Sequence, residues 1–222
     1  MKQLRKSETT KLFYDEFPYK LVINNSLSHI FRDKNLASAK EQLTILQAQY
    51  DHGEPLIWGS HFRRSTVTHS TFVEAKSLYI EFCKQIDYKL RVSNPRMNVY
   101  SHDRDWLLML SVKINSACEF YEPSKQHLSM LSKNVILLDT IPEYEYKITL
   151  GDRCDSNLAN WIVNNPDKAK AGPVCLSTIA RGAYTNGLYF YARDEKILQL
   201  LNLFLSKVVR IDKLVYKSND DK

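Results

Sequence analysis

Short runs of alternating apolar and polar residues recur along this chain, separated by longer segments with apolar residues at helical spacing. Strand-like runs lie at residues 18–23, 88–93, 97–101 and 117–122, and again at 145–150, 173–180, 188–193 and 208–217. Helical periodicity covers residues 36–50, 72–86 and 104–114, and then 157–164 and 195–206. For each half of the chain, this pattern predicts the order strand, helix, hairpin of two strands, helix, strand.

An internal echo supports this division into two similar halves. Residues 99–103 (VYSHD) are echoed by residues 190–194 (FYARD), and residues 18–23 resemble residues 145–150. Both copies of the first echo end in an aspartate, Asp103 or Asp194, directly before a helical run. A carboxylate at that place can accept a hydrogen bond from a free amide of the first turn, so both are predicted N-caps.

The predicted fold class is α+β, with two tandem ferredoxin-like (βαββαβ) units. Each unit has an antiparallel sheet with its helices on one face. The helix at residues 72–86 and a linking stretch at 58–70 form an insertion in the first unit. The expected units are residues 11–122 and 135–217, joined by a surface linker at 123–134.

Alternation along the third strand of each unit predicts a face that the helices do not cover. The side chains on this face are Asn98, Tyr100 and His102 in the first unit, and Tyr189, Tyr191 and Arg193 in the second. Tyrosines beside basic groups on an open sheet resemble the RRM mode of binding, in which bases stack on the rings. Packing of the two open faces against each other is the alternative.

A second candidate site is the basic stretch 60–70, which has no acidic residue and contains His61, Arg63, Arg64 and His69. Its arginines and hydroxyls are suited to phosphate, and its histidines to general acid–base cleavage of RNA without a metal. A solvated basic loop is the plainer interpretation. Arg91 lies beside the first hairpin, where it would extend the positive charge.

Composition agrees with a globular protein that has an anionic partner. The 222 residues are 44% hydrophobic and 25% charged, and the formal net charge is +6. No apolar run approaches the ~20 residues of a membrane span, and residues 1–10 are polar with no apolar segment after them. We therefore expect a cytoplasmic protein without a membrane partner.

Motifs for catalysis and cofactor binding are absent from the sequence. The four cysteines, Cys83, Cys118, Cys154 and Cys175, form no C-x-x-C pair, and the six histidines show no metal-ligand spacing. There is no Walker A loop, Rossmann fingerprint or nucleophile elbow. We expect reduced thiols, no cofactor and no metal, and a binding protein rather than an enzyme.

The tandem arrangement is similar to that of the RAMP superfamily, whose paired ferredoxin-like domains bind or cleave CRISPR repeat RNA. Residues 181–187 do not match the glycine-rich loop of that family, so no family is assigned. We expect binding of single-stranded RNA or DNA. The expected contact residues are Arg63, Arg64, Arg91, Tyr100, His102, Tyr189, Tyr191 and Arg193. A metal-independent ribonuclease using His61 or His69, and a protein–protein adaptor that binds no nucleic acid, stay open as alternatives.

Overall fold

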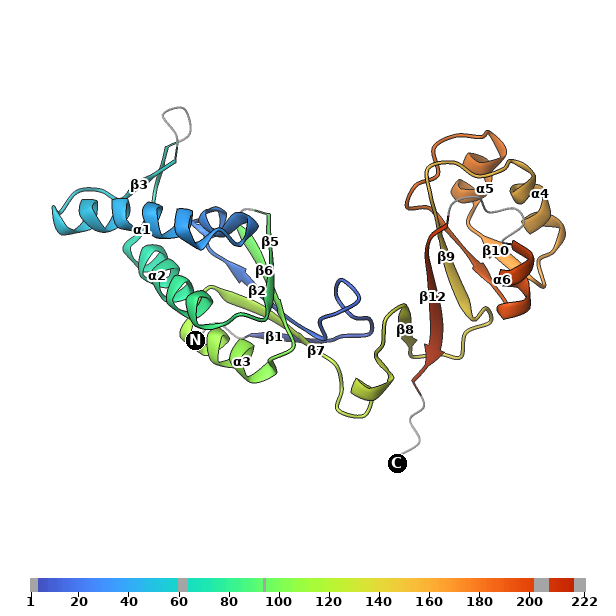
Figure 1. Ribbon diagram of the computed structural model, residues 1–222, viewed down its shortest axis with the longest axis horizontal. Helices are drawn as coiled ribbons and strands as arrows, with labels where there is room; N and C mark the ends of the chain where they lie inside the picture. Colours follow the sequence, from blue (N-terminus) through green and yellow to red (C-terminus); the bar gives the residue numbers. More distant parts are fainter. Residues whose placement is uncertain (1–3, 60–63, 94, 202–207, 218–222) are drawn as a thin grey trace. The chain divides into compact units, whose positions relative to one another are not determined.

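The computed structural model describes residues 4–59, 64–93, 95–201 and 208–217 (Figure 1). The chain forms two compact units. Unit 1 consists of Met1–Thr9 and Glu16–Lys125, and unit 2 of Thr10–Asp15 and Gln126–Lys222. The short segment Thr10–Asp15 therefore belongs to a different unit from the residues on either side of it.

The sheet of unit 1 has five strands in the order β1-β7-β2-β6-β5. Their bounds are β1 Arg5–Glu8, β2 Tyr19–Asn24, β5 Tyr88–Ser93, β6 Arg96–Ser101 and β7 Ala117–Glu122. The central strand β2 is antiparallel to β6 and to β7, and β6 is antiparallel to β5. At the other edge β1 runs parallel to β7. The sequence analysis predicts the last four strands but not β1.

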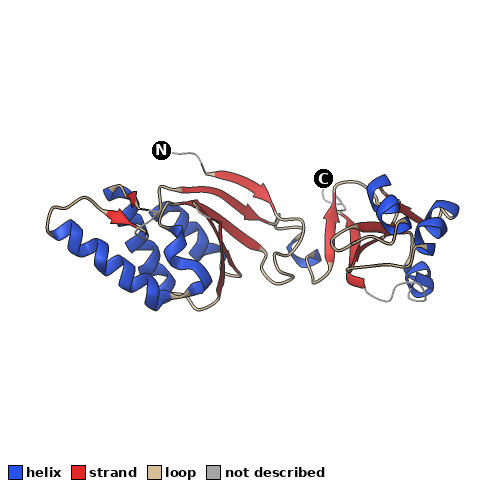
Figure 2. Ribbon diagram, turned by 90° about the horizontal axis from the view of Figure 1, so that it is seen from above, coloured by secondary structure: helices blue, strands red, loops and turns tan. Residues whose placement is uncertain are grey.

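The helices of unit 1 gather on one side of this sheet (Figure 2). They are the 3-10 segment η1 Ser28–Lys34 and the helices α1 Leu36–Asp51, α2 His69–Lys84 and α3 Arg104–Lys113. The inserted helix predicted at 72–86 is α2. A small hairpin, β3 Ile57–Trp58 paired with β4 Ser65–Thr66, occupies the stretch predicted only as a link. Among the described residues, no helix combines the length and the hydropathy that crossing a bilayer requires.

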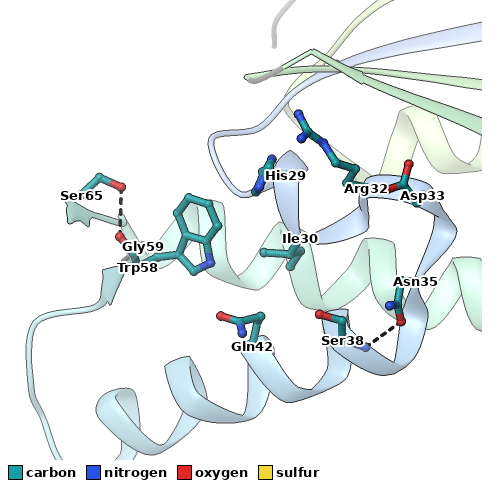
Figure 3. A pocket seen from close by; sticks show the side chains of 10 residues that line it. All are labelled: His29, Ile30, Arg32, Asp33, Asn35, Ser38, Gln42, Trp58, Gly59 and Ser65. Atoms are coloured by element: carbon teal, nitrogen blue, oxygen red, sulfur yellow. Dashed lines mark hydrogen bonds between the residues drawn. The ribbon is translucent and has the colours of Figure 1, made fainter. Parts of the chain in front are cut away.

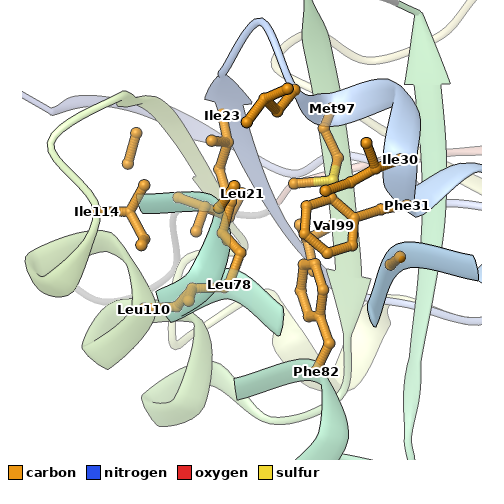
Figure 4. Close-up of a cluster of buried hydrophobic side chains, with 14 of the residues drawn as sticks. Leu21, Ile23, Ile30, Phe31, Leu78, Phe82, Met97, Val99, Leu110 and Ile114 are labelled. Atoms are coloured by element: carbon orange, nitrogen blue, oxygen red, sulfur yellow. The ribbon is translucent and has the colours of Figure 1, made fainter. Parts of the chain in front are cut away.

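The core of unit 1 lies between the helices and one face of the sheet (Figure 4). Leu21 and Ile23 of β2 and Val99 of β6 are fully buried on this face. Phe82 of α2 and Leu110 of α3 pack against them from the helical layer. Fully burying one such side chain stabilises a fold by about 1.5–3 kcal/mol, so this cluster holds the helices to the sheet.

The sheet of unit 2 also has five strands, in the order β10-β11-β9-β12-β8. Their bounds are β8 Val135–Leu138, β9 Tyr146–Leu150, β10 Ala169–Ala171, β11 Tyr189–Ala192 and β12 Val208–Tyr216. The helical segments are η2 Leu128–Met130, α4 Asn157–Asn164, α5 Pro173–Ala180 and α6 Glu195–Leu201. Ile148, Leu150 and Phe190 are fully buried beneath α4, α5 and α6.

The two sheets have the same plan. Read from the parallel edge, the order β8-β12-β9-β11-β10 matches β1-β7-β2-β6-β5 strand for strand. In both units the edge strand runs parallel to the last strand, and the remaining neighbours are antiparallel. The two similar segments found in the sequence, residues 18–23 and 145–150, form the central strands β2 and β9. Two five-stranded sheets therefore fit the tandem arrangement that the sequence predicts.

The two predicted N-caps are confirmed. The Asp103 carboxylate accepts a hydrogen bond from the Trp106 amide at 2.9 Å, and the Asp194 carboxylate accepts one from the Ile197 amide at 3.0 Å. Each satisfies a backbone donor that would otherwise lack an intrahelical partner. The third strand of each unit thus leads into its helix through the same capping interaction.

The strand predicted at 173–180 is wrong, because these residues form the helix α5. Pro173 occupies the first turn, where its fixed φ suits a helix and its missing N–H is not needed. Cys175 and Ile179, one helical turn apart, are the buried residues of α5, while Val174 is 71% exposed. The edge strand beside β11 is β10, which is only three residues long.

Ion pairs hold the segment Thr10–Asp15 within unit 2. The Lys11 ammonium lies 3.0 Å from the carboxylate of Asp212, which is 1% exposed. Arg210 donates to Asp212 through Nε at 2.5 Å and to the Asp15 carboxylate through Nη1 at 2.6 Å. Since a buried carboxylate is costly without partners, the two cations compensate Asp212 and fix this segment.

Glu81 of α2, which is 5% exposed, links two helices of unit 1. Its carboxylate accepts from Lys113 of α3 at 2.9 Å and from Lys84 at 3.2 Å. The hydrogen bond from Lys113 lowers the pKa of Glu81, and Lys84 acts in the same direction. Because the folded pKa lies below the unfolded value, this stabilisation is complete above about pH 4.3 and is lost as pH falls through the folded pKa.

We predict that Glu81→Gln lowers the free energy of unfolding by about 1–2 kcal/mol at pH 7, since the lysines are partly exposed. The deficit should shrink as the pH falls below about 4.3. Urea unfolding over a pH series measures both effects. Glu41→Gln removes an exposed carboxylate from α1 and should change stability by less than about 0.5 kcal/mol. A deficit that does not depend on pH would contradict the ionic link.

Candidate functional site

The face of the unit 1 sheet that points away from the helices carries a row of alternating lysines and tyrosines. Tyr100 of β6 is paired with Lys20 of β2 on one side and with Lys89 of β5 on the other. Lys20 is in turn paired with Tyr121 of β7, and its ammonium lies 3.4 Å from the centre of that ring. We call Lys20, Tyr100 and Lys89 the unit 1 row.

The open face of the unit 2 sheet repeats the row. Tyr191 of β11 is paired with Lys147 of β9 and with Lys170 of β10. We call these three residues the unit 2 row. The Lys147 ammonium lies 4.0 Å from the ring centre of Tyr189, and the two tyrosine rings meet edge to face at 5.6 Å. Burial raises the pKa of the Tyr191 hydroxyl, and the neighbouring Tyr189 raises it further.

Cations predominate on the rest of the unit 1 face. Strand alternation places Arg5, Arg91 and Arg96 on the same side as the row, and all three are exposed. Among the described strand residues of this face, Glu119 is the single carboxylate. It accepts hydrogen bonds from Arg96 at 2.8 Å and from the Tyr121 hydroxyl at 2.9 Å. With both lysines of the row, five cations thus face one anion, and phosphate is the natural complement.

Lys20 is half-buried at the centre of this face. Burial lowers the pKa of its ammonium, Glu119 opposes that shift, and Arg96 reinforces it. A lowered pKa means that the folded protein disfavours the charge of Lys20 relative to water. A further anion placed beside Lys20 would relieve that penalty, so the electrostatics favour an anionic ligand here.

A pocket of about 430 Å³ opens beside the unit 2 row. All three row residues line it, and Ile136, Leu138 and Leu214 add an apolar surface from β8 and β12. Its size is within the range of small-molecule sites. Tyr144 and Glu143 also line it, and the Glu143 carboxylate lies 3.7 Å from the Lys170 ammonium. The combination of an apolar wall, two tyrosines and two lysines suits a planar ring.

The residues expected to bind on unit 1 lie in different environments. Tyr100 is on the expected face but only 6% exposed, so in this conformation it offers no ring face to a base. His102 is exposed, and its ring Nδ1 lies 2.9 Å from the Asp87 carboxylate. Arg91 is exposed on the open face and forms no ion pair with any described residue. Of these three, Arg91 is the group best placed to meet phosphate.

In unit 2, Tyr189 is 44% exposed, Tyr191 is half-buried and Arg193 is exposed. All three follow the alternation of the open face, as the sequence predicts. In the basic stretch, His61 and Arg63 lie outside the described residues. Arg64 is exposed after them, and His69 begins α2 with its ring stacked on Tyr50 at 4.8 Å. The structure therefore does not bring the described part of this stretch onto either open face.

The lysines of the two rows were missed in the sequence analysis. Lys20 and Lys147 occupy the same place in the echoed segments 18–23 and 145–150, which is a signal that the sequence does contain. Lys89 and Lys170 become recognisable only through the strand register. Within the described residues, no cluster of three or more His, Cys, Asp or Glu side chains could hold a metal ion.

Comparison with known proteins gives no assignment: no protein-family model, no curated protein and no solved structure matches this chain.

We predict that Glu119→Gln lowers the pKa of Lys20 further, because Glu119 opposes the effect of burial. The pKa can be followed by NMR of the lysine methyl groups after reductive methylation, with Lys20→Arg to assign the signal. Glu122→Gln is the matched control, because Glu122 is on the same strand and pairs with Lys6 and Arg104. An equal change in both variants would contradict a local effect of Glu119 on Lys20.

Proposed function

We propose that this protein binds single-stranded nucleic acid through the open faces of its two sheets. The observation that carries the proposal is the duplicated row: a tyrosine between two lysines on three adjacent strands of both units. Neighbouring strands are about 4.8 Å apart, so the two lysines of a row are separated by about 10 Å. Cations spaced along a flat face with aromatic rings between them suit a flexible strand that presents both phosphates and bases.

The two faces contribute different chemistry to the proposed interaction. The unit 1 face has the larger excess of cations, and its central tyrosine is buried. We assign to it contacts with the phosphate backbone, in which Arg91 and Lys89 are the most exposed partners on β5. The unit 2 face has the exposed Tyr189 and the apolar pocket, and we assign base contacts to it. The Tyr189 ring is in contact with the Lys147 ammonium and with the Tyr191 ring, and its 44% exposure leaves surface for stacking.

We also propose that both units are variants of the ferredoxin-like fold. In chain order the four main strands of unit 1 are β2, β5, β6 and β7, and the last of these lies beside the first. A helix precedes the second strand, and another links the third to the fourth. Unit 2 has the same arrangement, with α5 added between its middle strands. The strand order and the helices on one side support this proposal.

We predict that affinity for single-stranded DNA falls steeply with salt and that Lys89→Ala/Arg91→Ala weakens this dependence. Each phosphate contact on a single strand contributes about 0.7 to the slope of log K against log salt, so two lost contacts should reduce the slope by about 1.4. Fluorescence anisotropy with a labelled oligonucleotide at several salt concentrations measures the slope.

The charge-matched control for this experiment is Lys40→Ala/Lys196→Ala, which removes two exposed lysines from α1 and α6. It should leave the slope nearly unchanged. An equal loss in both double variants would indicate attraction by net charge alone, and binding that does not depend on salt would refute the proposal. RNA recovered intact in the presence of EDTA would also exclude the ribonuclease alternative.

We predict that Tyr189→Leu weakens oligonucleotide binding by about 1–3 kcal/mol, whereas Tyr189→Phe keeps most of the affinity. The aromatic ring, rather than the hydroxyl, would provide the stacking surface. Anisotropy at a fixed, low salt concentration measures both variants. Equal losses in the two variants would instead assign the contact to the hydroxyl, and no loss in either would remove Tyr189 from the interface.

A further inference from the structure

Unit 1 contains a second candidate site, which shares no residue with its five-stranded sheet. A pocket of about 820 Å³ lies between η1, the start of α1 and the β3–β4 hairpin (Figure 3). Trp58 of the hairpin faces His29 and Ile30 of η1 across it, and Ser38 and Gln42 project from α1 (Figure 3). The volume is within the range of small-molecule sites, so the pocket can hold a ligand larger than a single ion.

The lining combines one large aromatic wall with hydrogen-bonding groups. The Trp58 indole is half-buried and meets the His29 imidazole edge to face at 5.7 Å. Within the described residues, the side chains of Arg32 and Gln42 make no hydrogen bond or ion pair. A purely apolar ligand would desolvate these groups without replacing their bonds to water. The lining therefore favours a flat ligand with a polar edge and an anionic group.

Charge and helix orientation also favour an anion. The first turn of α1 has no acidic residue, and its amide groups carry partial positive charge. The Asn35 side chain accepts a hydrogen bond from the Ser38 amide at 3.0 Å, which fixes the start of this helix beside the pocket. Arg32 adds a full positive charge, and the His29 imidazole adds ring nitrogens that can form a hydrogen bond with a phosphate. Asp33 is the one acidic residue among those that line the pocket.

The backbone beside the pocket is strained and held from outside. Asp33 and Lys34 have φ values of 58° and 56°, a left-handed conformation that is unfavourable for residues other than glycine. The Lys34 ammonium donates to the carbonyls of Ile86 at 2.9 Å and Tyr88 at 3.1 Å, and lies 3.8 Å from the Tyr88 ring centre. Strain maintained in this way is common at binding sites, because it positions a loop before the ligand arrives.

We propose that this pocket binds a nucleoside monophosphate, either free or as the phosphorylated end of a strand. The base lies against Trp58 with its polar edge at Gln42, and the phosphate lies beside Arg32 and His29. The proposal goes beyond strand binding by the open faces and does not depend on it, because the two sites share no residue.

The test uses fluorine NMR of the full-length protein labelled with fluorotryptophan. The chain has three tryptophans, Trp58, Trp106 and Trp161, and Trp58→Phe assigns the signal of interest. Adenosine and uridine monophosphate should shift the Trp58 signal and leave those of Trp106 and Trp161 in place. Adenosine alone should bind about tenfold more weakly, since it lacks the charge-assisted bonds to phosphate. Unchanged Trp106 and Trp161 signals in each variant verify the fold.

Arg32→Gln should weaken binding of the monophosphates about tenfold and leave binding of adenosine unchanged. Arg91→Gln, which removes the same charge from the open face, should leave both unchanged. No shift of the Trp58 signal at about 10 mM nucleotide, or an equal shift with inorganic phosphate, would overturn the proposal. Arg32→Gln should not alter the salt slope of binding for an oligonucleotide without a terminal phosphate, so failure here is distinguishable from failure of the proposed open-face function.

Two oligonucleotides of one sequence, with and without a terminal phosphate, distinguish the two sources of the nucleotide. A phosphorylated strand that shifts the Trp58 signal at lower concentration than the free monophosphate assigns the pocket to strand ends. A free monophosphate that binds as tightly as the phosphorylated strand, or more tightly, assigns it to a soluble nucleotide.

Discussion

Burial of one face of each central strand is the constraint on which both sheets depend. Leu21 and Ile23 of β2, and Ile148 and Leu150 of β9, are completely excluded from solvent. Because side chains alternate across a strand, a slip of one residue would expose these groups and bury charge. The same register directs Lys20 and Lys147 to the opposite face, so the hydrophobic core determines where the cations lie.

The position of Lys20 has an energetic cost that the neighbouring Tyr121 partly offsets. Partial burial disfavours a charged ammonium, as the lowered pKa of Lys20 indicates. A cation over an aromatic ring regains about 0.5–2 kcal/mol, and both Lys20 and Lys147 have such a ring within 4.0 Å. The recurrence of this cation–ring contact on the central strands of both units argues that the face has a shared role.

Local signals explain what the sequence could predict, and non-local pairing explains most of what it could not. The helices α1 and α4 and the caps Asp103 and Asp194 follow from periodicity and nearest neighbours. The helix α5 was mistaken for a strand because its β-branched residues outweighed the proline at its start. The short edge strands β1 and β8 have little pattern of their own and depend on their neighbours β7 and β12.

The candidate sites were harder to predict from the sequence than the fold, for the same reason. The tyrosines and Arg193 could be assigned to a face by counting along one strand. Lys89 and Lys170 can be recognised as members of the rows only from the pairing between strands. The Trp58 pocket combines a hairpin, a 3-10 segment and a helix that no periodicity connects. Since this pocket and the unit 1 row share no residue, substitutions in one should add to those in the other unless the core couples them. Two physical links join the sites: that core, organised by Leu21 and Ile23, and the Lys34 ammonium, which bonds to the carbonyl of Tyr88, the neighbour of Lys89 on β5.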